Sequence, residues 1–196
     1  MNLTTLYRIF EADWYALTLG TEIHYKDFEN EKGLLLMGRE MLGLYFHSKG
    51  NELKGAEVPF SIPFVNTDNG ECLDIPLEGI FDLIEEDDVV VEFKTCAKTI
   101  NPKDPDYYIQ LTAYSYAYQM LYQRPAKSLK IIAFVKTKKP KVVPSIAKRD
   151  KKDHQRFFYL VKEVLKGIRS QIFFPQPSFW CNDCEYEEPC WAWRGN

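Results

Sequence analysis

Strong charge of one sign, long apolar runs and a signal peptide are all missing from this sequence. Its 25 Lys and Arg residues nearly balance its 28 Asp and Glu residues, so the formal net charge is only −3. Such a chain has no overall attraction for nucleic acid, and any such role must come from a local cluster of charge. No apolar run reaches the roughly 18–20 residues that span a membrane. The N-terminal sequence MNLTTLYRIFEADWY lacks the basic start and apolar stretch of a signal peptide. We therefore expect a cytoplasmic protein with no membrane partner.

Cysteine is scarce as well. The five cysteines are an odd number, and three of them crowd near the C-terminus, unlike the disulfide framework of a secreted protein. What is present is 45% hydrophobic and 27% charged residues, an ordinary composition for a globular protein with a real core. We expect one domain, with N-terminal helices in residues 1–56, an α/β core in residues 57–174 and a Cys- and Trp-rich tail in residues 175–196.

The order of expected secondary structure predicts an α/β fold. Apolar residues recur at helical spacing in four segments, residues 4–19, 31–47, 107–123 and 154–171. Turn signals bound four strand-like segments, residues 56–64, 72–86, 89–95 and 128–137, of which the first three form an antiparallel meander. Residues 136–152 are expected to be a basic link, and the tail is too irregular for helix or strand. This order predicts a mixed central β-sheet flanked by helices.

The strand sequence VVVEFKT carries an unusual pair of charges. Glu92 and Lys94 are two residues apart and share a face of the strand. Opposite charges on such a strand are costly unless something uses them, although a surface ion pair is the plainer interpretation. Asp82 lies across the EEDD turn, so a hairpin would bring it beside them. Two close carboxylates favour a hard divalent ion between them, Mg²⁺ or Mn²⁺, and the backbone carbonyl of Phe93 offers a further oxygen ligand.

A family resemblance begins with these residues. The pattern D-x9-E-x-K resembles the core of the PD-(D/E)xK nuclease superfamily, with Phe81-Asp82 where the superfamily name has Pro-Asp. Gln110 and Tyr114 form a Q-x3-Y pattern in the following helix, which resembles the motif of RecB-type nucleases and of the related CRISPR-associated adaptation nucleases. Upstream, GTEIH resembles the G-T-x-x-H segment of that branch, whose histidine binds metal, and His24 is the matching residue.

The resemblance implies a restriction-endonuclease-like core and a function in DNA repair, recombination or CRISPR adaptation. The enzyme would be a metal-dependent deoxyribonuclease, an exonuclease acting on single-stranded DNA or duplex ends, with a helicase or an integrase as a further partner. The implied ligands of Mg²⁺ or Mn²⁺ are His24, Asp82, Glu92 and the backbone carbonyl of Phe93. The implied catalytic residues are Asp82, Glu92, Lys94, Gln110 and Tyr114. The alternatives are a sequence-specific endonuclease, an inactive DNA-binding or assembly subunit, and a structural domain with incidental ion pairs.

The tail carries a C-x2-C-x5-C pattern formed by Cys181, Cys184 and Cys190. Thiolates on a tight loop can converge on a soft metal or a cluster. Relatives with an iron–sulfur cluster have a fourth cysteine near the N-terminus, which this chain lacks, and neither Cys72 nor Cys96 is well placed to replace it. Three interpretations stay open: a [4Fe–4S] cluster with another fourth ligand, a zinc ion, or a metal-free tail packed through Phe179, Trp180, Trp191 and Trp193.

Positive charge gathers between residues 136 and 152, which include eight Lys or Arg residues and one Asp. Such a run is usually a solvated face, but here it follows the candidate site and could track a phosphate backbone. The candidate DNA contacts are Lys136, Lys138, Lys139, Lys141, Lys148 and Arg149. Tyrosines of the preceding helix could stack on unpaired bases, or belong to the core: Tyr107, Tyr108, Tyr116 and Tyr118.

Overall fold

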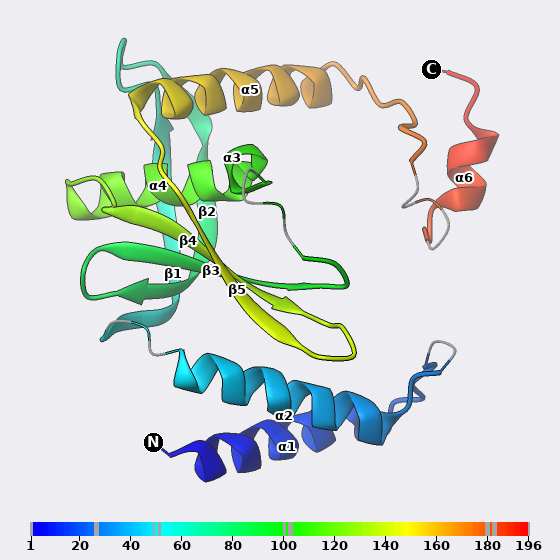
Figure 1. Cartoon of the computed structure of the whole chain (residues 1–196). Coiled ribbons are helices and arrows are strands. Elements are labelled where there is room, and N and C mark those ends of the chain that lie inside the picture. Colours follow the sequence, from blue (N-terminus) through cyan, green and yellow to red (C-terminus); the bar gives the residue numbers. More distant parts are fainter. Residues whose placement is uncertain are drawn as a thin grey trace.

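Five strands form one sheet in which spatial order follows chain order, β1-β2-β3-β4-β5 (Figure 1). A computed structural model describes residues 2–25, 28–48, 50, 52–99, 101, 104–178, 181 and 184–195. The strands are β1 (Leu53–Val65), β2 (Cys72–Glu85), β3 (Val89–Cys96), β4 (Ser128–Val135) and β5 (Lys141–Ala147). The helices are α1 (Leu3–Thr18), α2 (Glu31–His47), α3 (Asp104–Tyr107), α4 (Ile109–Tyr122), α5 (Lys151–Arg169) and α6 (Glu187–Ala192).

The sheet is mixed, as the sequence predicts. Strands β1, β2 and β3 form the expected antiparallel meander. Strand β4 runs parallel to β3, because α3 and α4 carry the chain back across the sheet between them, whereas β5 is antiparallel to β4. Strand β3, which carries Glu92 and Lys94, pairs with β4 along its whole length and with β2 only over residues 89–91.

Helices cover both faces of the sheet (Figure 1). Helices α4 and α5 lie on one face, over a cluster that includes Phe64, Phe81 and Leu111. Helix α2 lies on the other face, where Tyr45 packs against a smaller cluster around Val91. Burying a large apolar side chain stabilises the fold by roughly 1.5–3 kcal/mol. The two clusters fix β3 between two packed layers.

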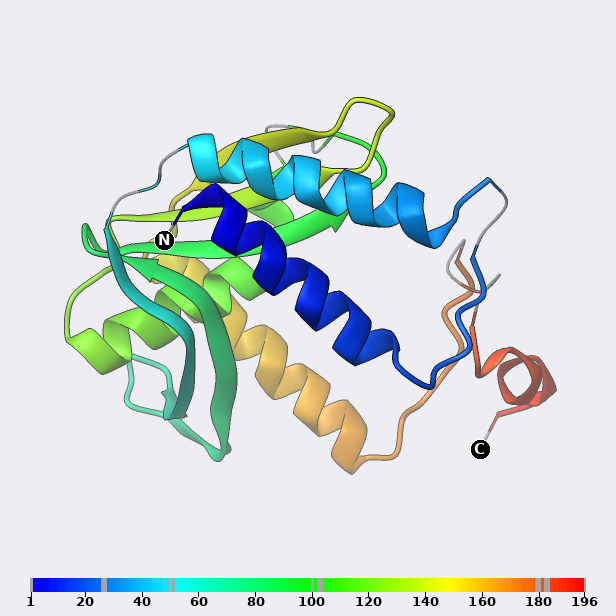
Figure 2. The same ribbon diagram turned by 90° about the horizontal axis from the view of Figure 1, so that it is seen from below.

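Helix α1 packs beside α2 (Figure 2), and two glycines of α2 permit the close approach. A Cβ atom added to Gly38 would clash with the ring of Phe10, and one added to Gly43 would clash with the hydroxyl of Tyr7. Glycine weakens a helix by about 1 kcal/mol relative to alanine. In α2 that cost is offset by aromatic side chains of α1 that fit where a β-carbon would stand.

Two sequence predictions about the elements were wrong. The expected basic link contains strand β5, an edge strand in which Pro144 pairs with Ile132. Edge strands commonly carry Pro and Lys, which hide the strand pattern in the sequence. The expected helix at 107–123 is confirmed as α4, and Tyr108 separates it from the short helix α3. The tail holds the short helix α6, whereas its sequence predicts an irregular segment.

The turn between β2 and β3 is held by Asp88. Its carboxylate accepts hydrogen bonds from the hydroxyl of Tyr118 at 2.6 Å, from Arg124 at 2.7 Å and from Lys54 at 3.2 Å. These donors lower the pKa of Asp88 from 3.8 to about 2, with the Tyr118 hydroxyl contributing most. The turn that aligns Asp82 with Glu92 is therefore fixed to α4 by a charged hydrogen-bond cluster.

We expect Asp88→Asn to lower the free energy of unfolding by about 1.5–3 kcal/mol at neutral pH, as is usual for hydrogen bonds to a charged group. Asn tolerates the left-handed backbone of this position, where φ is 59°. Because the folded pKa is depressed, the stabilisation is complete above pH 3.8 and is lost as the pH falls through about 2. Urea unfolding of both proteins across this pH range checks the prediction, and equal stabilities at neutral pH would contradict it.

Candidate active site

Asp82 lies where β2 separates from β3. The last pair of the ladder joins Leu83 to Val91, and the same register would place Asp82 opposite Glu92. Phe81 and Ile84 belong to the same buried cluster although they are three residues apart, so β2 departs from regular alternation at this point. The Asp82 carboxylate accepts a hydrogen bond from the backbone N–H of Phe93 at 2.8 Å. The hairpin that the sequence predicts is present, and the Asp82 carboxylate hydrogen-bonds to β3 at the point where the two strands separate.

The Glu92 carboxylate is buried and only partly satisfied. The residue is 3% exposed, and its Oε1 atom lies 2.5 Å from Nζ of Lys94. Within the described part of the chain, its Oε2 atom is buried and has no hydrogen-bond partner. A buried carboxylate oxygen without a partner is costly, and native proteins rarely leave one unused.

Helix α4 holds Lys94 in place through a chain of hydrogen bonds. Lys94 Nζ donates to Gln110 Oε1 at 2.8 Å, and Gln110 Nε2 donates to the hydroxyl of Tyr114 at 3.1 Å. The Tyr114 hydroxyl donates in turn to the backbone carbonyl of Ile80 at 2.7 Å. Burial, and next the negative charge of Glu92, raise the pKa of Tyr114, so its phenol stays protonated and can donate. This series of hydrogen bonds begins at Lys94 on β3, passes through two residues of α4 and ends at Ile80 on β2.

The donor set fits a small divalent cation. Mg²⁺ commonly takes one or two protein carboxylates and completes its shell with water and substrate phosphate. Asp82 and Glu92 supply two carboxylates, and the open Oε2 atom of Glu92 is a hard oxygen ligand in a buried setting. The backbone carbonyl of Phe93 stays a predicted ligand. Its N–H binds Asp82, and its ring packs against Tyr45 on the opposite face of the sheet.

His24 is placed differently from the carboxylates. It lies exposed in the segment that follows α1, and its role as a metal ligand stays a prediction. Among the described residues, no three His, Cys, Asp or Glu side chains gather closely enough to hold a metal ion. The structure therefore brings together Asp82, Glu92, Lys94, Gln110 and Tyr114, but it does not gather His24 with them.

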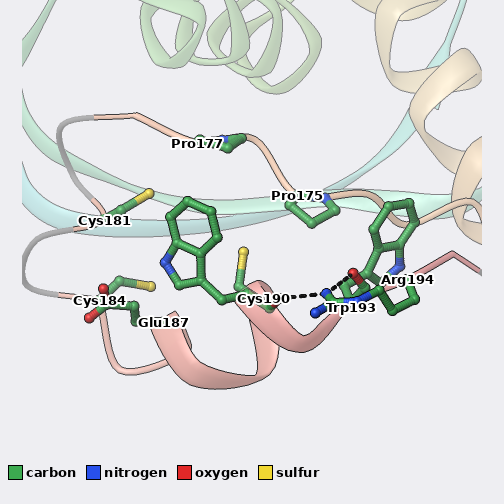
Figure 3. A pocket seen from close by; sticks show the side chains of 9 residues that line it. Pro175, Pro177, Cys181, Cys184, Glu187, Cys190, Trp193 and Arg194 are labelled. Atoms are coloured by element: carbon green, nitrogen blue, oxygen red, sulfur yellow. Dashed lines mark hydrogen bonds between the residues drawn. The ribbon is translucent and has the colours of Figure 1, made fainter.

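The tail cysteines line one pocket of about 220 Å³ (Figure 3). Cys181, Cys184 and Cys190 share it with Glu187 and Trp193, and all three thiols are free. The described residues around this pocket do not form a ready metal site.

The two described tryptophans of the tail are not buried. Trp191 is 65% exposed and Trp193 is 43% exposed. Phe179 and Trp180, which the metal-free interpretation also uses, lie outside the described residues. A cluster, a zinc ion and a metal-free tail all stay predictions.

The basic residues divide into two groups. Lys136, Lys138, Lys139, Lys141 and Lys148 are exposed along β5 and its flanking turns, and their contact with DNA stays a prediction. Arg149 instead makes contacts within the protein. Its guanidinium donates to the carbonyl of Pro105 at 2.7 Å and to the hydroxyl of Thr112 at 2.8 Å, which ties α3 and α4 to the start of α5. No local pattern signals this role, because the partners of Arg149 lie about 40 residues away along the chain.

The tyrosines proposed to stack on bases also divide. Tyr116 and Tyr118 are buried, 2% and 0% exposed, so the structure assigns them to the core. Tyr107 is 83% exposed at the end of α3. Tyr108 is half-buried against the core cluster, so Tyr107 is the exposed one of the four.

Within the described ranges, no helix is both long enough and apolar enough to cross a membrane.

Comparison with known proteins bears on the family and the fold. The model of the PD-(D/E)XK nuclease superfamily matches residues 2–191, whereas no curated protein matches. The crystal structure of SSO0001 is 15% identical over 97% of this chain and 80% of that chain, with a TM-score of 0.50. A candidate exonuclease from Eubacterium rectale is 14% identical over 100% of this chain and 76% of that chain, with a TM-score of 0.56. Such low identities show the fold alone, which is the restriction-endonuclease-like α/β fold predicted from the sequence. The family match over almost the whole chain shows that this protein belongs to the PD-(D/E)XK nuclease superfamily.

Proposed function

We propose that this protein is a deoxyribonuclease that depends on a divalent metal ion. The observation that carries the proposal is the buried Glu92 carboxylate, which has one oxygen on Lys94 and the other without a partner among the described residues. A buried charge in this state is costly for a structural domain, but it is useful where a cation and a phosphate have to be held together. Membership of a nuclease superfamily supports the same conclusion.

The residues of the site have distinct roles in this proposal. When bound to Asp82 and Glu92, Mg²⁺ or Mn²⁺ would supply Lewis-acid stabilisation of the phosphate. Lys94 supplies a second positive charge for the phosphate, and Gln110 and Glu92 fix the position of its amine before substrate arrives. Tyr114 fixes the orientation of the Gln110 amide. A cation that is already positioned needs no rearrangement as negative charge develops, which is how such groups lower a barrier.

The finer parts of the proposal rest on the resemblance. We infer an exonuclease that acts on single-stranded DNA or duplex ends, and the candidate exonuclease from Eubacterium rectale with a similar fold supports this mode of action. A place in repair, recombination or CRISPR adaptation, a cytoplasmic location, a helicase or integrase partner and the division into one domain with a tail stay predictions.

An inactive DNA-binding or assembly subunit is the main alternative. The complete set of Asp82, Glu92 and Lys94 argues against it, because a binding subunit gains nothing from a partly satisfied buried carboxylate. A sequence-specific endonuclease is the second alternative, and product lengths distinguish it from an exonuclease.

A cleavage assay tests the proposal. End-labelled single-stranded and duplex DNA are incubated with the protein in Mg²⁺, in Mn²⁺ and in EDTA. We expect cleavage that needs the metal and that shortens the DNA progressively from an end. Internal products of defined length would favour the endonuclease, and binding without cleavage in either metal would favour the inactive subunit.

The tail cysteines are proposed to hold a [4Fe–4S] cluster or zinc. Their shared pocket supports the proposal, since three thiols on one short segment are the ligand type that soft metals prefer. Iron, sulfide and zinc analysis of protein purified without oxygen tests it, and a metal-free preparation with full nuclease activity would contradict it.

A further inference from the structure

A second pocket lies between the start of α4 and the start of α5. Its volume is about 190 Å³, below the roughly 300–1,000 Å³ of pockets for drug-sized ligands. Tyr107, Ile109 and Leu160 form apolar walls, and they are 83%, 48% and 49% exposed. Figure 1 shows α3, which carries Tyr107, beneath α5. The pocket is thus small, apolar on its walls and open to solvent.

The pocket and the candidate active site share the first turn of α4. Ile109 lines the pocket, and its neighbour Gln110 receives the hydrogen bond from Lys94. Successive residues of a helix point in directions about 100° apart, and a helix with its side chains is about 10–12 Å across. A DNA strand that places one phosphate at Lys94 could therefore reach the pocket within a few nucleotides.

Apolar exposure continues from the pocket along α5. Leu160, Val164 and Ile168 follow one another at a spacing of four residues and are 49%, 53% and 50% exposed. Side chains four residues apart lie on the same side of a helix, so these three form one apolar flank. The flank leads away from the pocket toward the tail, and it offers a path on which further bases could lie.

The polar groups of the pocket are suited to the edge of a base rather than to a phosphate. Its two cations, Arg149 and Arg156, are balanced by Asp106 and Asp153. Arg149 already donates hydrogen bonds to a backbone carbonyl and to Thr112. Asp153 accepts a hydrogen bond from the backbone N–H of Asp150. A phosphate would meet no net positive charge here, whereas an unpaired base needs apolar contact on its faces and polar groups at its rim.

We propose that this pocket binds the base of an unpaired nucleotide of the strand being cleaved, with Tyr107 as its stacking platform, which makes single-stranded DNA the preferred substrate. The inference rests on the proposed nuclease function and specifies its substrate. In a duplex the bases are stacked and paired, and they cannot enter the pocket without being flipped out.

The test compares wild type with Tyr107→Ala, Tyr107→Trp and Tyr15→Ala. Tyr15 is an exposed tyrosine on the remote helix α1, 55% exposed, and serves as the matched control. The affinity for a labelled single strand, for the same strand with abasic sites and for a duplex is measured by fluorescence anisotropy in EDTA, where no cleavage is expected.

Tyr107→Ala should weaken binding of the normal strand roughly five- to 150-fold, the range for loss of a base-stacking aromatic residue. Binding of the abasic strand and the duplex should hardly change, Tyr107→Trp should retain affinity, and Tyr15→Ala should match wild type. The inference is overturned if Tyr107→Ala binds the normal strand like wild type, which would leave the apolar flank for a protein partner. It is also overturned if all three ligands weaken equally. Absence of any DNA cleavage by wild type would instead refute the proposed function, so the two failures are distinguishable.

Discussion

Replacing Lys94 with alanine is expected to reduce metal-dependent DNA cleavage by about 100- to 1,000-fold, the usual cost of removing one preorganised group that stabilises developing negative charge. In the structure the amine of Lys94 is held by Gln110 at 2.8 Å and by Glu92 at 2.5 Å, so its position does not depend on substrate. Initial rates on end-labelled single-stranded DNA at saturating Mg²⁺ measure the effect.

The control for this experiment is Lys127→Ala. Lys127 is an exposed lysine that also pairs with a carboxylate, that of Asp87, but it lies on the turn before β4, and its removal should leave the rate unchanged. Lys94→Ala leaves the buried Glu92 without a cation, so thermal unfolding must confirm that the variant is folded. Lys94→Gln is a second variant that keeps most of the side chain and loses only the charge. Cleavage at the wild-type rate by a folded Lys94 variant would refute the catalytic role.

Divalent ions are expected to stabilise wild-type protein and to have no such effect on Glu92→Gln. An ion at 100 times its dissociation constant adds about 2.7 kcal/mol to the free energy of unfolding, which for a chain of this size raises the melting temperature by about 5–10 °C. The physical reason is the Oε2 atom of Glu92, which is buried and has no hydrogen-bond partner among the described residues. Melting curves of the protein without DNA, recorded at increasing Mn²⁺ concentrations, measure the effect without relying on activity.

Glu78→Gln is the matched control, because Glu78 is an exposed carboxylate on the same strand as Asp82 and bonds only to Ser61 in the described structure. It should respond to Mn²⁺ like wild type. His24→Ala in the same titration tests the remaining ligand prediction, which requires a weaker response at low Mn²⁺. Equal stabilisation of wild type and Glu92→Gln would show that Glu92 does not hold the ion.

The sequence alone determined the features that depend on local spacing. Glu92 and Lys94 share a face because a strand alternates, and Gln110 meets Tyr114 because a helix repeats within four residues. The EEDD turn brings Asp82 to the level of Glu92 because a short turn determines which residues of the two strands pair. Each of these predictions needs only a few neighbouring residues, and for that reason these local contacts follow from the amino-acid sequence. The order of the expected helices and strands likewise predicts the fold class.

Only the tertiary structure decided which polar and aromatic groups are satisfied, buried or free. Strand β5 exists because it pairs with β4, and its own sequence of Lys, Val and Pro does not specify a strand. Tyr107 and Tyr118 lie eleven positions apart in one stretch of sequence, yet one is 83% exposed and the other is fully buried. Likewise, the open oxygen of Glu92 arises because strands and helices from distant parts of the chain enclose it without offering a donor among the described residues. Burial and hydrogen-bond satisfaction are properties of packing between distant segments, and local spacing carries no information about them.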